Sequence, residues 1–377
     1  MKVGVHRISM DHPGDVSGLR RLIDDGDVYA EEIVACIGKT EGNGGANDFT
    51  RALATAQVTG LLSQLLQLPG PEILKRVALV WSGGCEGVLS PHMTVFTRGT
   101  TRSETVPTAA QSAGTGAERL AVSVQRTRSF LPEEVGRTAE VLEVAAAARR
   151  ALDELQVGPS AVHYVQVKGP LLTPAGIADA AARGQRVVTD DPNRSKAYAR
   201  GATALGVGIA LGEIEPDKVN DEVIAKDMSL FSAVTSTSAG GELTDCEVIM
   251  FANSADATGE YRIGHGYLED AVDAPGVRAA LRAAGLEFDC EPDAYAQKQI
   301  AAVFAKAEAP PGGRLRGQRT TMLSDADINY ERHARAAVGA VIASVTGDPR
   351  IFVSGGTEHQ APPGQAPIAA IVRVGAA

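Results

Sequence analysis

The chain repeats one order of features three times along its 377 residues. Each copy begins with a short apolar run that ends at a lysine, continues with a helix-like stretch that carries an arginine, and closes with a second apolar run that leads into a serine. In chain order, the lysines are Lys39, Lys168 and Lys306, the arginines are Arg51, Arg200 and Arg335, and the serines are Ser82, Ser238 and Ser354. A motif order that recurs in this way indicates a fold built from three copies of one unit.

The apolar runs predict buried strands, and the stretches between them predict helices. Strands are expected at 33–37, 77–81, 162–167, 231–235, 300–305 and 351–353. The helices are expected to begin at about Asn47, after Asn193 and after Asp327. Since strands alternate with helices, the predicted fold class is α/β, with three homologous repeat units about a pseudo-threefold axis and one central active site.

The composition of two stretches predicts where the units meet. Residues 98–116 are rich in Thr, Ser, Ala and Gly and are expected to form a linker, and a weaker break lies near 254–259. We therefore expect repeat unit A at 1–103, unit B at 112–250 and unit C at 256–377. The strand order within each unit stays open at this level.

Charge and hydropathy exclude several classes of protein. The net charge of −10, from 46 acidic and 36 basic residues, argues against a nucleic-acid partner. The N-terminus lacks the apolar core of a signal peptide, and no stretch approaches the ~20 apolar residues of a membrane span, so a soluble cytoplasmic protein without a membrane partner is expected. The cysteines are scattered without a CxxC pair, which disfavours a disulfide framework or a thiolate zinc site.

The repeated residue types suggest acyl-transfer chemistry. A single lysine at a strand end is usually a solvated charge, but three in register favour a desolvated site, where a lysine loses its proton more easily and can act as a base for a neighbouring serine. The glycines after the serines allow backbone N–H groups to approach a carbonyl oxygen. Three planar guanidinium groups suit a flat, threefold ligand that displays carbonyl edges. The alternative is that the arginines pair with carboxylates on helix surfaces.

The motifs IGKTEGNGGANDFTR, SGGCEGVLSPHMTVF, VQVKGPLLTPA, AKAEAPPGG, TMLSDADIN and VSGGTEHQAPPGQ resemble the cyanuric acid hydrolase and barbiturase family of ring-opening amidohydrolases. The resemblance covers essentially the whole chain. It implies a homotetramer of three-unit chains that hydrolyse cyanuric acid to carboxybiuret, which then loses carbon dioxide to give biuret. No cofactor is implied for catalysis itself.

The resemblance also implies roles for particular residues. Ser238 is expected to be the nucleophile and Lys168 its general base, although Ser236 and Thr237 offer competing hydroxyls. Substrate-binding roles are implied for Arg51, Ser82, Gly83, Arg200, Ser238, Ala239, Arg335, Ser354, Gly355, Lys39 and Lys306.

A structural divalent cation, Mg²⁺ or Ca²⁺, is implied in unit C, where oxygen ligands of the kind these ions prefer are expected. Its implied ligands are Glu308, Thr357, Gln360, Ala361, Pro362 and Gln365. A Pro-rich turn with a purely structural role is the alternative reading of the same loop.

Two other functions remain open. A barbiturase would use the same motifs on a pyrimidine ring, and Glu331, near Arg335, is the candidate specificity position that would separate the two substrates. A non-catalytic protein that binds a small molecule would need only the arginines and the backbone donors, so retention of both Lys168 and Ser238 counts against it.

Overall fold

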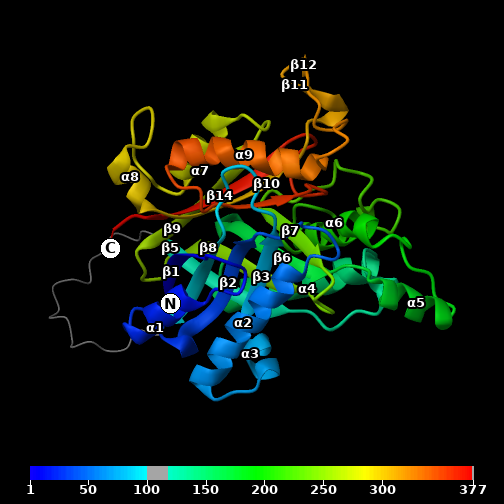
Figure 1. Ribbon diagram of the computed structural model, residues 1–377, viewed down its shortest axis with the longest axis horizontal. Helices are drawn as coiled ribbons and strands as arrows, with labels where there is room; N and C mark the ends of the chain where they lie inside the picture. The colour runs from blue at the N-terminus through cyan, green and yellow to red at the C-terminus, as the bar shows by residue number, and fades with distance from the viewer. Residues whose placement is uncertain (100–117, 376–377) are drawn as a thin grey trace.

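Three four-stranded sheets, each formed by one third of the chain, occupy the centre of the molecule. The computed structural model describes residues 1–99 and 118–375. In these residues the helices lie around the outside of the strands, with α2 and α3 on one side and α7 and α9 on the opposite side (Figure 1). The arrangement is the predicted α/β fold of three repeat units.

The elements follow the same general order in each third. The first third contains β1 (Lys2–Ser9), α1 (Ser17–Asp24), β2 (Ile33–Thr40), α2 (Phe49–Leu66), α3 (Gly70–Arg76), β3 (Ala78–Gly83) and β4 (His92–Gly99). The second contains β5 (Arg119–Arg126), α4 (Thr138–Leu155), β6 (Val162–Pro170), α5 (Pro174–Ala182), α6 (Pro192–Ala210), β7 (Thr235–Gly240) and β8 (Glu247–Ser254). The third contains β9 (Tyr261–Leu268), α7 (Ala274–Ala283), α8 (Ala294–Gln299), β10 (Ile300–Ala307), β11 (Arg314–Leu315), β12 (Gln318–Arg319), α9 (Tyr330–Thr346), β13 (Phe352–Gly355) and β14 (Ala366–Arg373).

The strand order is the same in all three sheets. It is β1-β4-β2-β3 in the first, β5-β8-β6-β7 in the second and β9-β14-β10-β13 in the third. The last two strands of each order are parallel, because a helix connects them, and the other neighbours are antiparallel. The two strands of each parallel pair therefore have their carboxyl ends on the same side of the sheet. The predicted lysine and serine lie near these ends.

Each sheet has two buried faces. One face packs against helices of its own third, as Trp81 packs with Leu62 of α2. The other faces meet in a common core, in which Phe96, Phe251 and Phe304 form a triangle with ring centroids 4.8 to 6.3 Å apart, one from each sheet. Burial of three aromatic rings at the centre stabilises the packing of the three units against one another.

Several predicted boundaries were wrong by a few residues. The N-caps of α2, α6 and α9 are Asp48, Asp191 and Asn329, whose side chains accept hydrogen bonds from the first free backbone N–H groups of each helix. Helix α6 therefore begins before Asn193, and α9 begins later than predicted. Strand β7 begins at Thr235 and not at 231, because the N–H of Ser232 donates to the His359 carbonyl outside the sheet.

The predicted linker at 98–116 begins too early, since β4 continues to Gly99, and its remainder lies outside the described residues. The unit boundaries of 1–103, 112–250 and 256–377 stay predictions. None of the helices in the described part of the chain has the length and apolar character needed to cross a membrane.

Candidate active site

The three predicted lysine and serine pairs are direct neighbours across parallel strands. Lys39 pairs with Ser82 between β2 and β3, and Lys168 pairs with Ser238 between β6 and β7. Between β10 and β13, Lys306 pairs with Ser354. All three lysines are buried. The repeat in the sequence is therefore a repeat in space, with each pair at the carboxyl end of two parallel strands.

Each lysine also reaches into a neighbouring unit. Lys39 Nζ donates to the Val353 carbonyl at 2.7 Å. In the same way, Lys168 Nζ donates to Trp81 O at 3.1 Å and Lys306 Nζ to Thr237 O at 2.7 Å. Every accepting carbonyl belongs to the residue before a serine. The three ammonium groups are consequently linked around one axis, and the centre of the site is shared by all units.

Burial makes these lysines unusual bases. It lowers the pKa of Lys39 to about 8, with Arg335 acting in the same direction. Burial lowers the pKa of Lys168 as well, against the opposing effect of Glu242, and it lowers the pKa of Lys306 well below its ordinary value. A lysine that is neutral near physiological pH can accept a proton.

A small cavity lies where the carboxyl ends of the parallel strands of the three sheets meet. Its empty volume is about 380 Å³, including space that is open to solvent. Its lining consists of Gly44, Arg51, Trp81, Ser82, Gly83, Lys168, Lys196, Arg200, Ser238, Ala239, Glu331, Arg335, Ser354 and Gly355. The predicted serines, arginines and adjoining small residues are thus brought together. Lys39 and Lys306 are not part of the lining, and they contact lining residues at the Ser82 hydroxyl and the Gly355 carbonyl, respectively.

The hydroxyl groups of the site differ in their partners. Ser82 Oγ accepts from Lys39 Nζ at 3.2 Å. The Oγ atoms of Ser238 and Ser354 are buried and have no hydrogen-bond partner among the described residues. Thr237 donates to the Arg200 carbonyl at 3.0 Å, and neither Ser236 nor Thr237 lines the cavity. Of the three candidate hydroxyls in this part of unit B, only that of Ser238 is available to a ligand in the central cavity.

The arginines come from the first half of α2, α6 and α9 and pair with glutamates of a different unit. Arg200 binds Glu358 through Nε and Nη2, both at 2.7 Å. Arg335 binds Glu86 through the same two nitrogens at 2.9 and 2.5 Å. Arg51 contacts Glu242 through Nε at 3.1 Å. These three partners are carboxylates, as the alternative supposed, but they lie in the turns after β3, β7 and β13 and not on helix surfaces.

Sequence reasoning missed these glutamates, although the signal was present. Glu86, Glu242 and Glu358 each follow a repeat serine by four positions, in SGGCE, SAGGE and SGGTE. Burial alone would raise the pKa of Glu242, but Lys168 and Arg51 outweigh it and bring the pKa to about 2. Glu242 is therefore ionised. The three glutamates together hold the guanidinium groups that line the cavity.

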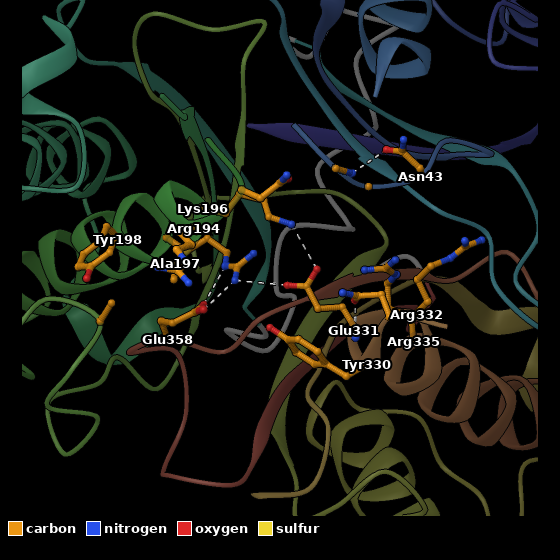
Figure 2. Close-up of a pocket in the computed structure, with 16 residues that line it drawn as sticks. Asn43, Arg194, Lys196, Ala197, Tyr198, Tyr330, Glu331, Arg332, Arg335 and Glu358 are labelled. Atoms are coloured by element: carbon orange, nitrogen blue, oxygen red, sulfur yellow. Dashed lines mark hydrogen bonds and ion pairs between the residues drawn. The ribbon is translucent and has the colours of Figure 1, made fainter. Parts of the chain in front are cut away.

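A larger and more open cavity, with an empty volume of about 1320 Å³, adjoins the central one, and the two share Gly44, Lys196, Arg200, Glu331 and Arg335 in their linings. Figure 2 shows Lys196 and Glu331 pointing toward each other across it, and their charged groups are 3.4 Å apart. Burial would raise the pKa of Glu331, yet Arg200 and Lys196 lower it to about 2. We refer to this ion-paired outer cavity as the mouth.

The predicted metal ligands lie together near the end of β10 and in the loop after β13. Glu308 and Gln365 line one cavity, and Thr357 Oγ1 lies 3.5 Å from Glu308 Oε2. Gln360 uses its side-chain oxygen to accept from the Thr237 N–H at 2.7 Å. Ala361 is buried and Pro362 half-buried. No group of three or more His, Cys, Asp or Glu suited to a metal occurs among the residues described, so a cation here would depend on Glu308 and backbone carbonyl oxygens.

Comparison with known proteins assigns the family. Residues 4–373 match the family described as amidohydrolase ring-opening protein. The chain is 62% identical to a cyclic amide hydrolase of Azorhizobium caulinodans over 99% of this chain and 100% of that one, and 41% identical to barbiturase 1 of Nocardioides sp. over 99% of each. A solved structure of a cyanuric acid hydrolase matches with a TM-score of 0.91 at 48% identity, covering 99% of both chains. With the matching register of its three Lys–Ser pairs, this chain belongs to the ring-opening amidohydrolases, enzymes that hydrolyse C–N bonds in cyclic amides.

Proposed function

We propose that this protein is a cyanuric acid amidohydrolase that uses a serine and a lysine to open the s-triazine ring. The observation that carries the proposal is the set of three Lys–Ser pairs in equivalent register around one cavity. Cyanuric acid is a flat ring with three equivalent carbonyl edges, so a threefold set of donors matches its symmetry. The similarity to a solved cyanuric acid hydrolase supports the same substrate.

In the proposed reaction, Ser238 Oγ attacks a ring carbonyl carbon while Lys168 Nζ takes the serine proton. The new C–O bond pushes the carbonyl electrons onto oxygen, where the backbone N–H of Ala239, which lines the cavity, would stabilise the charge. The tetrahedral carbon then expels the ring nitrogen, which receives the proton from Lys168. Water hydrolyses the resulting ester, returns a proton to Ser238 and releases carboxybiuret, which decomposes to biuret and carbon dioxide.

The other repeat residues would bind and orient the ring. Ser82 and Ser354, with the backbone of Gly83 and Gly355, face the same cavity as Ser238 and would hold the remaining carbonyl edges. Arg51, Arg200 and Arg335 line it as well and would polarise ring oxygens. Lys39 would act through the Ser82 hydroxyl that it holds, and Lys306 through the Gly355 carbonyl. Fixing the ring in this way lowers the entropic cost of attack.

The direct test measures hydrolysis of cyanuric acid and of barbituric acid by the same purified protein. Consumption of cyanuric acid with release of biuret and carbon dioxide is the expected result. Preferential hydrolysis of barbituric acid would instead assign the activity named for the Nocardioides relative. Tight binding of cyanuric acid without turnover would mean a binding protein and would overturn the proposal.

A divalent cation and a homotetramer form part of the same proposal. Glu308, Thr357 and the carbonyls of Gln360, Ala361, Pro362 and Gln365 would hold Mg²⁺ or Ca²⁺, which supplies structural support to the loop after Ser354. Burial raises the pKa of Glu308, with Glu358 adding to the effect, as expected for a carboxylate that gains from a nearby cation. Metal analysis of the purified enzyme, and its mass in solution by light scattering, test these two points.

A further inference from the structure

The three repeat glutamates do not bind their arginines in the same way. Glu86 and Glu358 each use both carboxylate oxygens to grip Nε and Nη2 of one arginine. Glu242 contacts only Nε of Arg51, and the oxygen that makes this contact, Oε1, also lies 3.4 Å from Lys168 Nζ. One of the three carboxylates is therefore shared between an arginine and a lysine.

The cause of the difference lies three residues before Arg51. Asp48 caps α2 and places Oδ2 3.4 Å from Arg51 Nη1, while Nη2 of the same arginine donates to the Gly45 carbonyl at 3.1 Å. The equivalent positions before Arg200 and Arg335 are Ala197 and Arg332, which offer no carboxylate. Because two nitrogens of the Arg51 guanidinium face Asp48 and Gly45 of its own unit, only Nε contacts Glu242. The Glu242 carboxylate can therefore also contact Lys168.

This arrangement makes Lys168 distinct from its two counterparts. Among the described residues, neither Lys39 nor Lys306 has a carboxylate oxygen within 4.0 Å of Nζ, the limit for an ion pair, whereas Lys168 has Glu242. Of the serines that line the cavity, Ser238 and Ser354 have an Oγ atom without a hydrogen-bond partner among the described residues, and both are free to attack on geometry alone. The carboxylate contact is what separates the middle pair from the third.

We propose that Glu242 is the third member of a Ser238–Lys168–Glu242 triad, in which it positions Lys168 Nζ and stabilises the ammonium formed when Lys168 takes the serine proton. The inference rests on the proposed function and deepens it. A lysine in a dry site is a weak base because its charged form is poorly solvated, and an adjacent carboxylate offsets that cost at the moment the charge forms. The single carboxylate thus selects the middle pair as the reacting one and couples it to Arg51, which lines the substrate cavity.

The charged groups around Lys168 fix the expected direction of a pH effect. Burial and Arg51 lower its pKa, whereas Glu242 and, more weakly, Glu247 of the adjacent strand β8 raise it. Removal of the Glu242 charge should therefore lower the pKa of Lys168 further. The acidic limb of kcat/KM, which reports protonation of the base, should move to lower pH.

The experiment compares Glu242→Gln with Glu86→Gln and Glu358→Gln, which neutralise the equivalent carboxylates but have no lysine of the described residues within ion-pair distance. We expect all three variants to lose kcat/KM, because each weakens the hold on an arginine. Only Glu242→Gln should also lower kcat by at least about tenfold and shift the acidic limb down by about one pH unit, the usual effect of a close opposite charge. An acidic limb that stays in place in Glu242→Gln would overturn the triad.

A second variant tests the position of the carboxylate without changing charge. A Cβ at Gly240 would lie 2.3 Å from the Glu242 oxygens, so Gly240→Ala must displace them. We expect a lower kcat than wild type with the charge retained, and unchanged kcat would contradict the positioning role. Glu242→Asp, which keeps the charge on a shorter side chain, should recover part of the shift in the limb.

The inference can fail separately from the proposed function. If the wild-type protein hydrolysed neither ring, the proposed function would fall, and the Lys168 titration would then be followed by NMR of ¹³Cε-labelled lysine, with the signal assigned by its loss in Lys168→Arg. A lower Lys168 pKa in Glu242→Gln than in wild type would support the contact. Identical titrations in both proteins would refute it, with or without turnover.

Discussion

The inner and outer parts of the site differ in symmetry. We call the inner part, where the three Lys–Ser pairs and the repeat arginines meet, the floor. The floor is nearly threefold, since Lys39, Lys168 and Lys306 occupy equivalent strand positions and each bonds to a neighbouring unit. The mouth is not, because the positions four residues before the three arginines are Asn47, Lys196 and Glu331. A symmetric floor can recognise a symmetric ring in any of three orientations. The asymmetric side chains, including Glu242 with its shared carboxylate, must decide which carbonyl reacts.

The largest expected effect breaks the equivalence of the floor at its serines. Ser238→Ala should reduce kcat by at least about 10⁴-fold, because it removes the attacking atom. Ser82→Ala and Ser354→Ala should cost only roughly ten- to a hundredfold, since each loses a hydrogen bond to the ring. Steady-state kinetics of the three variants give the comparison. If Ser238→Ala were the least affected, the nucleophile would lie in another unit.

The second effect concerns the base. Lys168→Arg should be inactive although it keeps the charge, since a guanidinium does not release its proton near neutral pH. In the wild type, burial places the pKa of Lys168 below the ordinary 10.5, so kcat/KM should rise as pH rises through that lowered value and fall away below it. Substantial turnover by Lys168→Arg would remove the lysine from the chemical step.

The third effect tests whether the arginines act as an equivalent set. Truncation of Arg51, Arg200 or Arg335 to Ala removes a charge-assisted hydrogen bond worth ~1.5–3 kcal/mol, which corresponds to roughly a ten- to hundredfold loss in kcat/KM. It also removes the ion pair that this arginine makes with Glu242, Glu358 or Glu86, respectively. Lysine replacements should rescue poorly, because an ammonium lacks the planar fork. Near wild-type efficiency in two of the three alanine variants would end the threefold description of the floor.

The smallest effect is expected at the mouth. Lys196→Met breaks the contact with Glu331, but Arg200 still lies 3.5 Å from that carboxylate, so the loss in kcat/KM for cyanuric acid should stay below about tenfold. The more informative readout is the ratio of activity on cyanuric acid to that on barbituric acid in Glu331→Gln. A ratio identical to that of the wild type would remove Glu331 as a specificity residue.

Most of the Lys–Ser pairs and arginines of the floor were predictable, because they belong to short motifs that the sequence repeats three times. The strand that ends at Lys168 and the strand that carries Ser238 are each visible as local patterns, and their equivalence to the other two pairs follows from the repeat. The start of β7 was misplaced because Phe231, Ala233 and Val234 are apolar and yet precede the first residue of the strand, Thr235. Burial and strand pairing give the same sequence signal, and only the partner of each N–H group distinguishes them.

The sequence by itself determined the three-unit α/β architecture, the family, and the repeat serines and arginines that line the central cavity. Only the tertiary structure decided how those residues pair. Arg51 meets Glu242, Arg200 meets Glu358 and Arg335 meets Glu86, across 191, 158 and 249 positions of the chain. Such contacts depend on which unit follows which around the axis and on the direction in which each guanidinium turns. Both are set by the packing of the three sheets on their common core, which no local pattern encodes.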